Sequence, residues 1–226
     1  MERWISALSK CPIFTNLSEK EIIGAFRDIS YITEKFEKGR VIYREGETSR
    51  RIGIIIEGCL EMRKYLPTGK VLSIFHRGCG EMLGGSIIFS SHPQYPCDVI
   101  AKEQSLLLWI DRNIMLGIFL KNPTIALNIL RISADRIMQF EQRVELFSMY
   151  SIQKKIAFSL MKDFPVDEKQ GVSIPFSKTT WAEYLNVSRT SLSRELKIMC
   201  TQGIIEMKGN KIFIRQRAML EALLYE

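Results

Sequence analysis

Hydrophobic residues between positions 32 and 112 come in short runs that turn residues interrupt. The runs are RVIYREGE, RIGIIIEGCLEMRKY, KVLSIFHRG and DVIAKEQSLLLWI, and glycines or the segments PTG and HPQYP separate them. Short apolar runs bounded in this way are typical of β-strands. The segment LPTGK, residues 66–70, has the composition of a hairpin turn. We therefore predict an antiparallel sandwich or roll in this part of the chain.

The pattern changes at Asn122, where a long stretch with helical periodicity begins. Asn122 is the expected N-cap and Pro123 the first helical residue, and no Gly or later Pro interrupts the next 28 or so residues. Positions spaced alternately by four and three form a heptad seam, apolar at all but one position: Ala126, Leu130, Ser133, Ile137, Phe140, Val144 and Phe147. A helix buried against its own domain is one explanation. At roughly 40 Å, its length favours a homodimer with Leu130, Ile137, Phe140, Val144 and Phe147 in the interface.

The last part of the chain, from about residue 151, has the order of elements of a winged helix. IQKKIAFSLMKDF is amphipathic, two short helical segments follow, and KGN, residues 208–210, is a tight turn between two short strands. The first short helix begins after Ser177 and the second after Ser188, and both serines are expected N-caps.

The two short helices also meet the requirements of a helix-turn-helix. Trp181, Leu185, Val187 and Leu192 supply apolar anchors, Ala182 allows close approach, and Asn186 tolerates the left-handed conformation of the turn. Along VSRTSLSREL, a helix places Arg189, Thr190, Ser193, Arg194 and Lys197 on one arc, while Leu192, Leu196 and Met199 fall on another. One arc can pack on a core while the other presents hydrogen-bond donors.

Charge agrees with this interpretation. The chain carries a net charge of +7, and residues 176–217 contain eight Lys or Arg against three Glu. Such an excess favours a polyanionic partner, although a solvated surface would look the same by charge alone. Because Arg donates two hydrogen bonds to the O6 and N7 atoms of guanine, and the second helix of this motif enters the major groove, Arg189 and Arg194 are predicted to read guanines in double-stranded DNA.

Taken together, these segments resemble the CRP/FNR family of bacterial transcription regulators over nearly the whole chain. The most specific match is FSKTTWAEYLNVSRTSLSRELKIMCTQGII, and FEKGRVIYREGE, IIIEGCLEM and GEMLGGSIIFS match the family's β-roll. The resemblance implies an α+β protein with three parts. They are an effector-sensing antiparallel β-roll (jelly-roll, cyclic-nucleotide-binding-like) over residues 1–121, a dimerisation helix over 122–150, and a winged helix-turn-helix DNA-binding domain over 151–226.

For DNA contacts, the resemblance implies that Arg189, Thr190 and Arg194 occupy base-reading positions, with Ser193 as a further candidate. Ser177 and Thr179 match positions that touch phosphates, and Ser188 at the helix start is a further candidate DNA contact. Thr190 replaces a Glu that is frequent in the family, so the preferred half-site is open. Glu195 replaces a usually apolar residue, which predicts greater exposure of the helix there.

For the effector, the resemblance places the pocket at Gly84, Gly85, Ser86, Tyr95, Pro96, Phe140 and Glu141. Gly85 stands where cyclic-nucleotide-binding members carry Glu, and Tyr95 and Pro96 stand where they carry Arg and Ser or Thr. We expect no tight cyclic AMP binding, because the cation for the cyclic phosphate is missing from its usual position. A less polar or aromatic effector is one alternative, and a degenerate pocket in a ligand-independent DNA-binding regulator is the other.

Other chemistry is disfavoured. Cys11 is the only cysteine near the start and His76 and His92 are the only histidines, so no iron-sulfur cluster or haem is expected. A cupin-like metal enzyme needs several histidines with a carboxylate, and no catalytic motif is present. A dimeric scaffold without DNA binding is a third class. No run of about 18 apolar residues or signal peptide is seen. The five cysteines are scattered and odd in number, so the expected setting is a reduced cytoplasm. RNA polymerase is a further expected partner.

Overall fold

The computed structural model describes residues 4–69, 71–163, 172–173, 177–209 and 211–225. These residues form two compact units, 1–136 and 137–226, and the division falls inside the long helix. Lys70 and Asn210, each the last residue of a predicted turn, lie outside the described residues.

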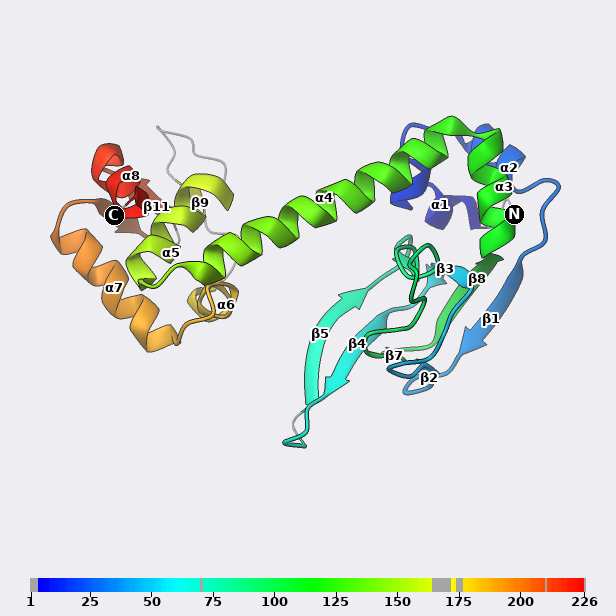
Figure 1. Cartoon of the computed structure of the whole chain (residues 1–226), viewed down its shortest axis with the longest axis horizontal. Coiled ribbons are helices and arrows are strands. Elements are labelled where there is room, and N and C mark those ends of the chain that lie inside the picture. The colour runs from blue at the N-terminus through cyan, green and yellow to red at the C-terminus, as the bar shows by residue number, and fades with distance from the viewer. Residues whose placement is uncertain (1–3, 70, 164–171, 174–176, 210, 226) are drawn as a thin grey trace. The chain divides into compact units, whose positions relative to one another are not determined.

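The described residues of the first unit form eight antiparallel strands (Figure 1). They are β1 (Ile32–Phe36), β2 (Val41–Tyr43), β3 (Arg51–Glu57), β4 (Leu60–Tyr65), β5 (Val71–Arg77), β6 (Met82–Leu83), β7 (Asp98–Ala101) and β8 (Ser105–Asp111). One sheet has the order β1-β8-β3-β6 and the other β2-β7-β4-β5. The predicted antiparallel roll is confirmed, as is the hairpin between β4 and β5, where the Gly69 amide donates to the Leu66 carbonyl at 2.9 Å.

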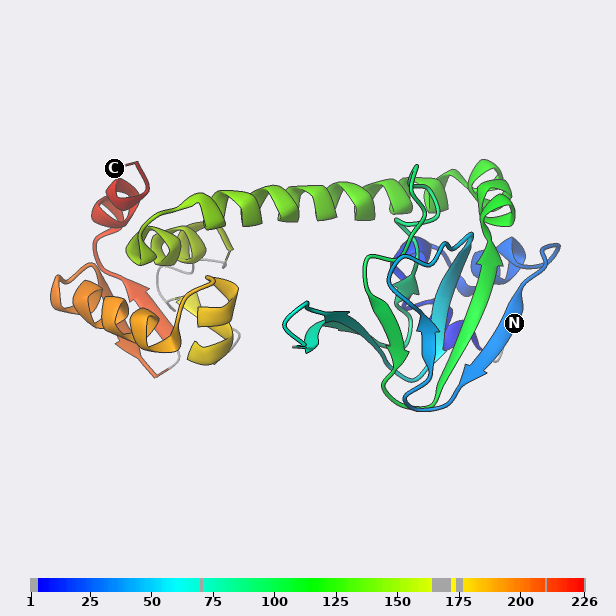
Figure 2. The ribbon, with the colours of Figure 1, turned by 60° about the horizontal axis from the view of Figure 1, so that its bottom comes forward.

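Apolar residues on the inner faces of the two sheets form the core of the roll. Figure 2 shows the ribbon of these sheets from a second direction. Ile55, Leu107 and Trp109 come from one sheet, and Leu60 and Val99 from the other. Gly53 on β3 is required by this packing, because a Cβ atom there would lie 2.6 Å from the ring of the neighbouring Trp109.

Short helices cover the outer face of the sheet that contains β3 and β8. They are α1 (Ile5–Leu8), the 3-10 helix η2 (Pro12–Phe14), α2 (Glu19–Ala25) and α3 (Arg112–Lys121). Ser18 caps α2 in a capping box with Glu21, as its sequence favours. Ile52, Ile54 and Ile110 pack against these helices in a second apolar core.

The long helix α4 (Pro123–Ser148) starts as predicted. The Asn122 side chain accepts a hydrogen bond from the Thr124 amide at 3.1 Å and Pro123 is the first helical residue. The buried Asn128 amide group donates to the carbonyls of Ile13 and Thr15 at 2.9 and 2.8 Å, which fixes this end of α4 to the N-terminal segment.

The second unit contains α5 (Ile152–Phe158), the π-helix η3 (Ser159–Asp163), α6 (Lys178–Tyr184), α7 (Arg189–Thr201) and α8 (Arg217–Tyr225). Its sheet has the order β10-β11-β9, from β9 (Val172–Ser173), β10 (Ile205–Lys208) and β11 (Lys211–Ile214). The predicted winged helix is confirmed, with Lys208 paired to Lys211 across the turn. Trp181, Leu192 and Leu196 are among the buried residues of its core.

Within the described residues, no single helix is long and apolar enough to span a membrane. The bent pair α3 and α4, which meet at 116°, would pass such a test only on combined length and composition.

Candidate functional sites

The α6–turn–α7 segment has the local geometry that its sequence predicts. Ser177 caps α6 by accepting from the Thr180 amide at 3.2 Å, and Ser188 caps α7 by accepting from the Ser191 amide at 3.0 Å. Asn186 in the turn has φ of +53°, the left-handed region that Asn tolerates better than most residues. The turn therefore sets α7 at a fixed angle to α6 through local backbone chemistry.

Helix α7 divides into a buried and an exposed face. Leu192, Leu196 and Met199 are buried in the core of the second unit. The exposed face carries Arg189, Thr190 and Arg194, with Ser193 half-buried at its border and Thr179 exposed on α6. The predicted DNA contacts from α7 thus gather on one accessible surface.

On this surface, hydroxyl groups at the start of α7 make hydrogen bonds with one another, whereas the two guanidinium groups remain accessible. The hydroxyl oxygen of Ser188 lies 2.8 Å from that of Thr190 and 2.8 Å from that of Ser191. Arg189 makes no ion pair within the part of the chain that the structure describes, whereas Arg194 Nε lies 3.3 Å from Glu195 Oε1. The Arg194 side chain is nevertheless 70% exposed. Both guanidinium groups are accessible to a ligand.

The expectation of greater exposure at Glu195 was wrong. Its side chain is only 16% exposed and accepts a hydrogen bond from Gln153 Nε2 at 3.0 Å. The Glu195 carboxylate can lie in this half-buried position because Gln153 of α5 donates a hydrogen bond to it. Glu195 thus links α7 to α5 by a hydrogen bond, at a position where an apolar side chain would link them by packing.

The C-terminal end of α6 receives two cations from other helices. Arg143 of α4 donates to the Tyr184 carbonyl at 2.8 Å, and Lys155 of α5 donates to the Leu185 carbonyl at 3.2 Å. The Arg143 guanidinium also lies 4.0 Å from the centre of the Tyr184 ring. Cations at a helix C-terminus compensate its unpaired carbonyls and its dipole. Helix α6 is therefore held by the last turns of α4.

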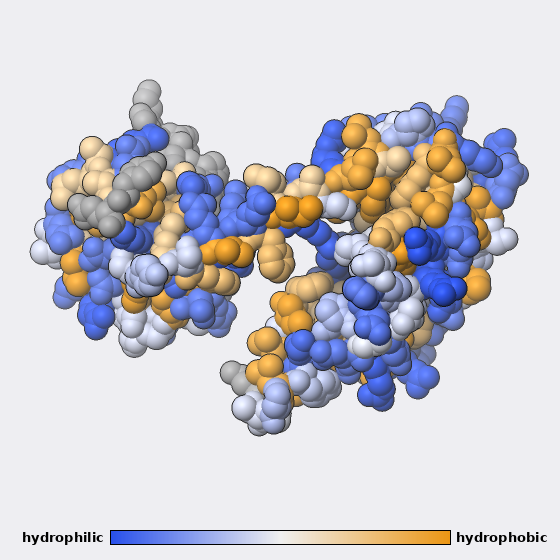
Figure 3. Space-filling model, in the orientation of Figure 1, coloured by the Kyte–Doolittle hydropathy of each residue, from blue (hydrophilic) through white to orange (hydrophobic). Residues whose placement is uncertain are grey.

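The exposed stretch of α4 carries the predicted interface residues. Leu130, Ile137, Phe140, Val144 and Phe147 are all exposed, from 49% for Phe147 to 75% for Phe140. Figure 3 shows hydrophobic residues along α4 on the face that it draws. A row of large apolar side chains in contact with water is typical of a surface that another chain covers.

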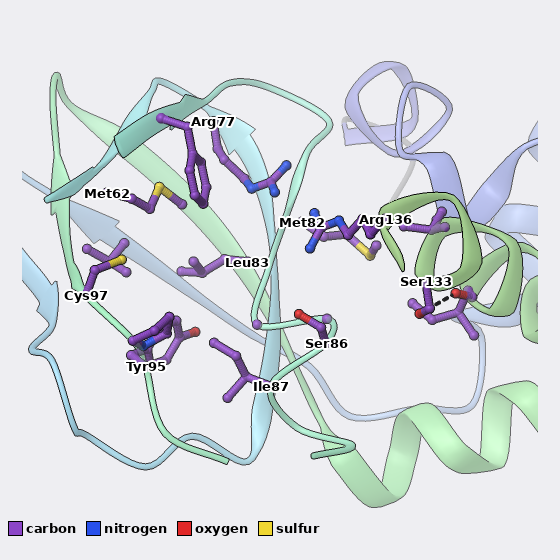
Figure 4. A pocket seen from close by; sticks show the side chains of 17 residues that line it. Met62, Arg77, Met82, Leu83, Ser86, Ile87, Tyr95, Cys97, Ser133 and Arg136 are labelled. Atoms are coloured by element: carbon purple, nitrogen blue, oxygen red, sulfur yellow. Dashed lines mark hydrogen bonds between the residues drawn. The ribbon is translucent and has the colours of Figure 1, made fainter. Parts of the chain in front are cut away.

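A pocket in the first unit lies between the roll and α4, and its volume open to water is about 210 Å³ (Figure 4). Gly84, Gly85, Ser86, Tyr95 and Pro96, all predicted from the resemblance, line it. Phe140 and Glu141 are not among its described lining residues and belong to the second unit. Gly84 has φ of +82°, and a Cβ atom there would lie 3.0 Å from the Tyr95 hydroxyl.

Two arginines that sequence reasoning missed also line the pocket. Arg77 comes from the end of β5 and Arg136 from α4. The pocket therefore has cations, although the positions of Tyr95 and Pro96 supply none. Arg77 Nη1 pairs with Glu81 Oε1 at 2.8 Å, while Arg136 makes no ion pair within the described part of the chain. Burial and the neighbouring Arg77 lower the pKa of Arg136 from its ordinary value.

The inner end of the pocket is apolar and aromatic. Met62, Leu83 and Val99 line it, and Tyr95 stacks on Tyr43 with ring centres 4.1 Å apart. The buried Tyr95 hydroxyl makes no hydrogen bond of normal geometry among the described residues, although Ser49 is close enough to act on its pKa. Burial raises the pKa of this hydroxyl, so it is a neutral donor.

Two family models match this chain, one in each part of it. Residues 33–122 match the model of the cyclic nucleotide-binding domain, and residues 154–223 match that of the Crp-like helix-turn-helix domain. The chain is a transcription regulator of the CRP/FNR family. The family assignment explains the order of roll, long helix and winged helix, and it shows that the chain carries a DNA-binding domain.

Among CRP/FNR relatives, the cyclic AMP receptor protein of Thermus thermophilus is 21% identical over 95% of this chain and 97% of its own length. The anaerobic regulatory protein of Bacillus subtilis is 20% identical over 94% and 92%. The crystal structure of the Thermus thermophilus catabolite activator protein has a TM-score of 0.56 at 20% identity, and the match covers 95% of this chain and 98% of that one. This structural likeness supports the shared fold.

Proposed function

We propose that this CRP/FNR regulator acts as a homodimer that reads a pseudo-palindromic site in double-stranded DNA, under the control of a small molecule bound in the roll. One observation carries the proposal: α7 buries Leu192 and Leu196 while it exposes Arg189 and Arg194. The arrangement suits a helix that fits the major groove and donates to guanine edges.

The dimer supplies the second copy of α7. The exposed apolar row along α4 supports a symmetric interface, and two copies of α7 would then address adjacent major grooves, about 34 Å apart. Ser177 and Thr179 at the start of α6 are suited to phosphate contacts, which set position without reading sequence. RNA polymerase is the expected protein partner at the promoter.

The pocket supports control by an effector over the ligand-independent alternative. Among the described residues, it contains an arginine without an ion pair and a buried hydroxyl without a hydrogen bond of normal geometry, and both groups suit a polar ligand. An effector shifts the protein toward its DNA-binding arrangement only as far as it binds that arrangement more tightly.

The decisive experiment is selection of bound sequences from a random double-stranded DNA library, followed by measurement of Arg194→Ala on the selected site. We expect the wild-type protein to select a palindrome. The variant should lose about 1–3 kcal/mol of binding free energy on that site and should prefer no particular base at one position. Breaking the pair with Glu195 costs little of this, because exposed ion pairs contribute about 0–1 kcal/mol.

Arg27→Ala is the matched control, since it removes one exposed cation from the first unit. It should leave both affinity and preference unchanged. If Arg194→Ala weakens all sequences equally and lowers the salt dependence, Arg194 contacts phosphate rather than base. If the wild-type protein enriches no sequence with or without cell extract, the proposed function is wrong.

A further inference from the structure

The pocket of the first unit has a polar end and an apolar end. Arg77 and Arg136 mark the polar end, and their side chains extend toward one another from β5 and α4 (Figure 4). Met62, Leu83 and Val99 belong to the apolar lining. Ligand sites that combine an apolar wall with a few placed polar groups select ligands that have one apolar part and one polar part.

The charge at the polar end is unbalanced. The Glu81 carboxylate pairs with Arg77 Nη1 at 2.8 Å and accepts from the Gly78 amide at 2.7 Å, so both of its oxygens are in use. Arg136 has no such partner within the described structure. One guanidinium charge therefore remains at the pocket, next to a second guanidinium that is 20% exposed.

Arg77 is only 20% exposed and Arg136 is exposed, and two like charges at one pocket repel each other unless an anion binds between them. Burial is the main cause of the lowered pKa of Arg136, and the second cause is repulsion by the Arg77 charge. A carboxylate or phosphate would relieve it, and guanidinium groups bind either anion through paired hydrogen bonds.

Resting on the proposed function, we propose that the effector is a small molecule with an apolar body and one anionic group, and that Arg77 and Arg136 hold the anion. The apolar body lies along Met62, Leu83 and Val99. This binding mode leaves Tyr95 and Pro96 without an anion to hold, which agrees with the absence of Arg at those two positions.

The same binding mode gives a way for a ligand bound in the pocket to act on α4. Arg77 lies at the end of a strand of the roll and Arg136 in α4, so one anion held by both guanidinium groups joins the two elements. Arg136 is the last residue of the first unit, directly before the exposed Ile137 of the apolar row. The ligand would thus act on the helix at the start of its exposed segment.

The test measures dissociation constants of three probes by ligand-observed NMR on the full chain: 3-phenylpropanoate, phenyl phosphate and the neutral 3-phenylpropanamide. We expect at least one anion to bind at least tenfold more tightly than the amide. The two anionic arms distinguish a carboxylate effector from a phosphate effector.

Arg136→Gln should abolish the preference for the anion. Arg131→Gln, which removes an exposed arginine of the same helix that does not line the pocket, should retain it. Arg136 has no ion pair to lose in the described structure, so the variant is expected to fold, and its circular dichroism melting curve checks this.

Equal affinity for anions and amide in the wild-type protein would overturn the proposal, as would an anion preference that survives in Arg136→Gln. These results are separate from the DNA selection. A palindrome recovered from a protein that fails the anion test would leave the proposed function in place and remove only this effector class.

Discussion

The apolar row along α4 makes a quantitative prediction about dimerisation. Phe140 is 75% exposed in the single chain and lies at position d of the heptad seam. Full burial of a Phe side chain is worth about 1.5–3 kcal/mol, so covering this fraction contributes about 1–2 kcal/mol per copy. A symmetric dimer contains two copies of Phe140, so the substitution removes this contribution twice. Phe140→Ala should therefore raise the dimer dissociation constant by a factor between roughly 40 and more than 1,000.

Sedimentation equilibrium across a concentration series measures that constant directly. Met138→Ala is the matched control, because Met138 is 57% exposed on the same helix but falls at heptad position b, away from the seam. Neither change removes a core contact, so the melting curve at high dilution should remain unchanged for both variants. A change of less than about fivefold for Phe140→Ala, or an equal effect of Met138→Ala, would refute the assignment of the seam as the interface.

Two further predictions concern stability. The Arg63 guanidinium, 2.6 Å from Glu61, lowers the pKa of that carboxyl from 4.5 to about 2, so the stabilisation is present above pH 4.5 and is lost as the pH falls toward 2. Glu61→Gln should flatten the unfolding free energy over that range in urea titrations, and an unchanged pH profile would contradict the coupling. Ser159→Ala should lower the unfolding free energy by about 1–3 kcal/mol in denaturant melts followed by tryptophan fluorescence, because the buried Trp181 Nε1 loses its acceptor at 3.0 Å. A loss below about 0.5 kcal/mol would show that Trp181 finds another acceptor.

Local chemistry explains which elements the sequence could predict. The caps at Ser177 and Ser188, the left-handed Asn186 and the start of α4 at Asn122 each depend on residues within one turn of the chain. Their hydrogen bonds are made by neighbours, so composition and spacing were sufficient. The same holds for the two faces of α7, where helical periodicity alone separates Leu192 from Arg194.

The polar end of the pocket could not be predicted in this way. Arg77 and Arg136 are distant in the sequence, and only the packing of α4 on the roll brings them together. Nothing in the local pattern distinguishes Arg136 from Arg131. Glu195 was misjudged for the same reason, because its donor Gln153 belongs to another helix.

The two cations at the C-terminal end of α6 determine which motions can control DNA recognition. Arg143 and Lys155 bind consecutive carbonyls, and Leu146 of α4 is buried in the same core as Trp181 of α6. The last two turns of α4 and the first helix of the DNA-reading motif must therefore rotate or translate as one rigid body. A conformational signal that arrives along α4 does not need to cross a flexible joint at this point. Under the proposed function, it would reach the DNA groove as a change in the orientation of α7, without a change in the internal structure of the winged helix.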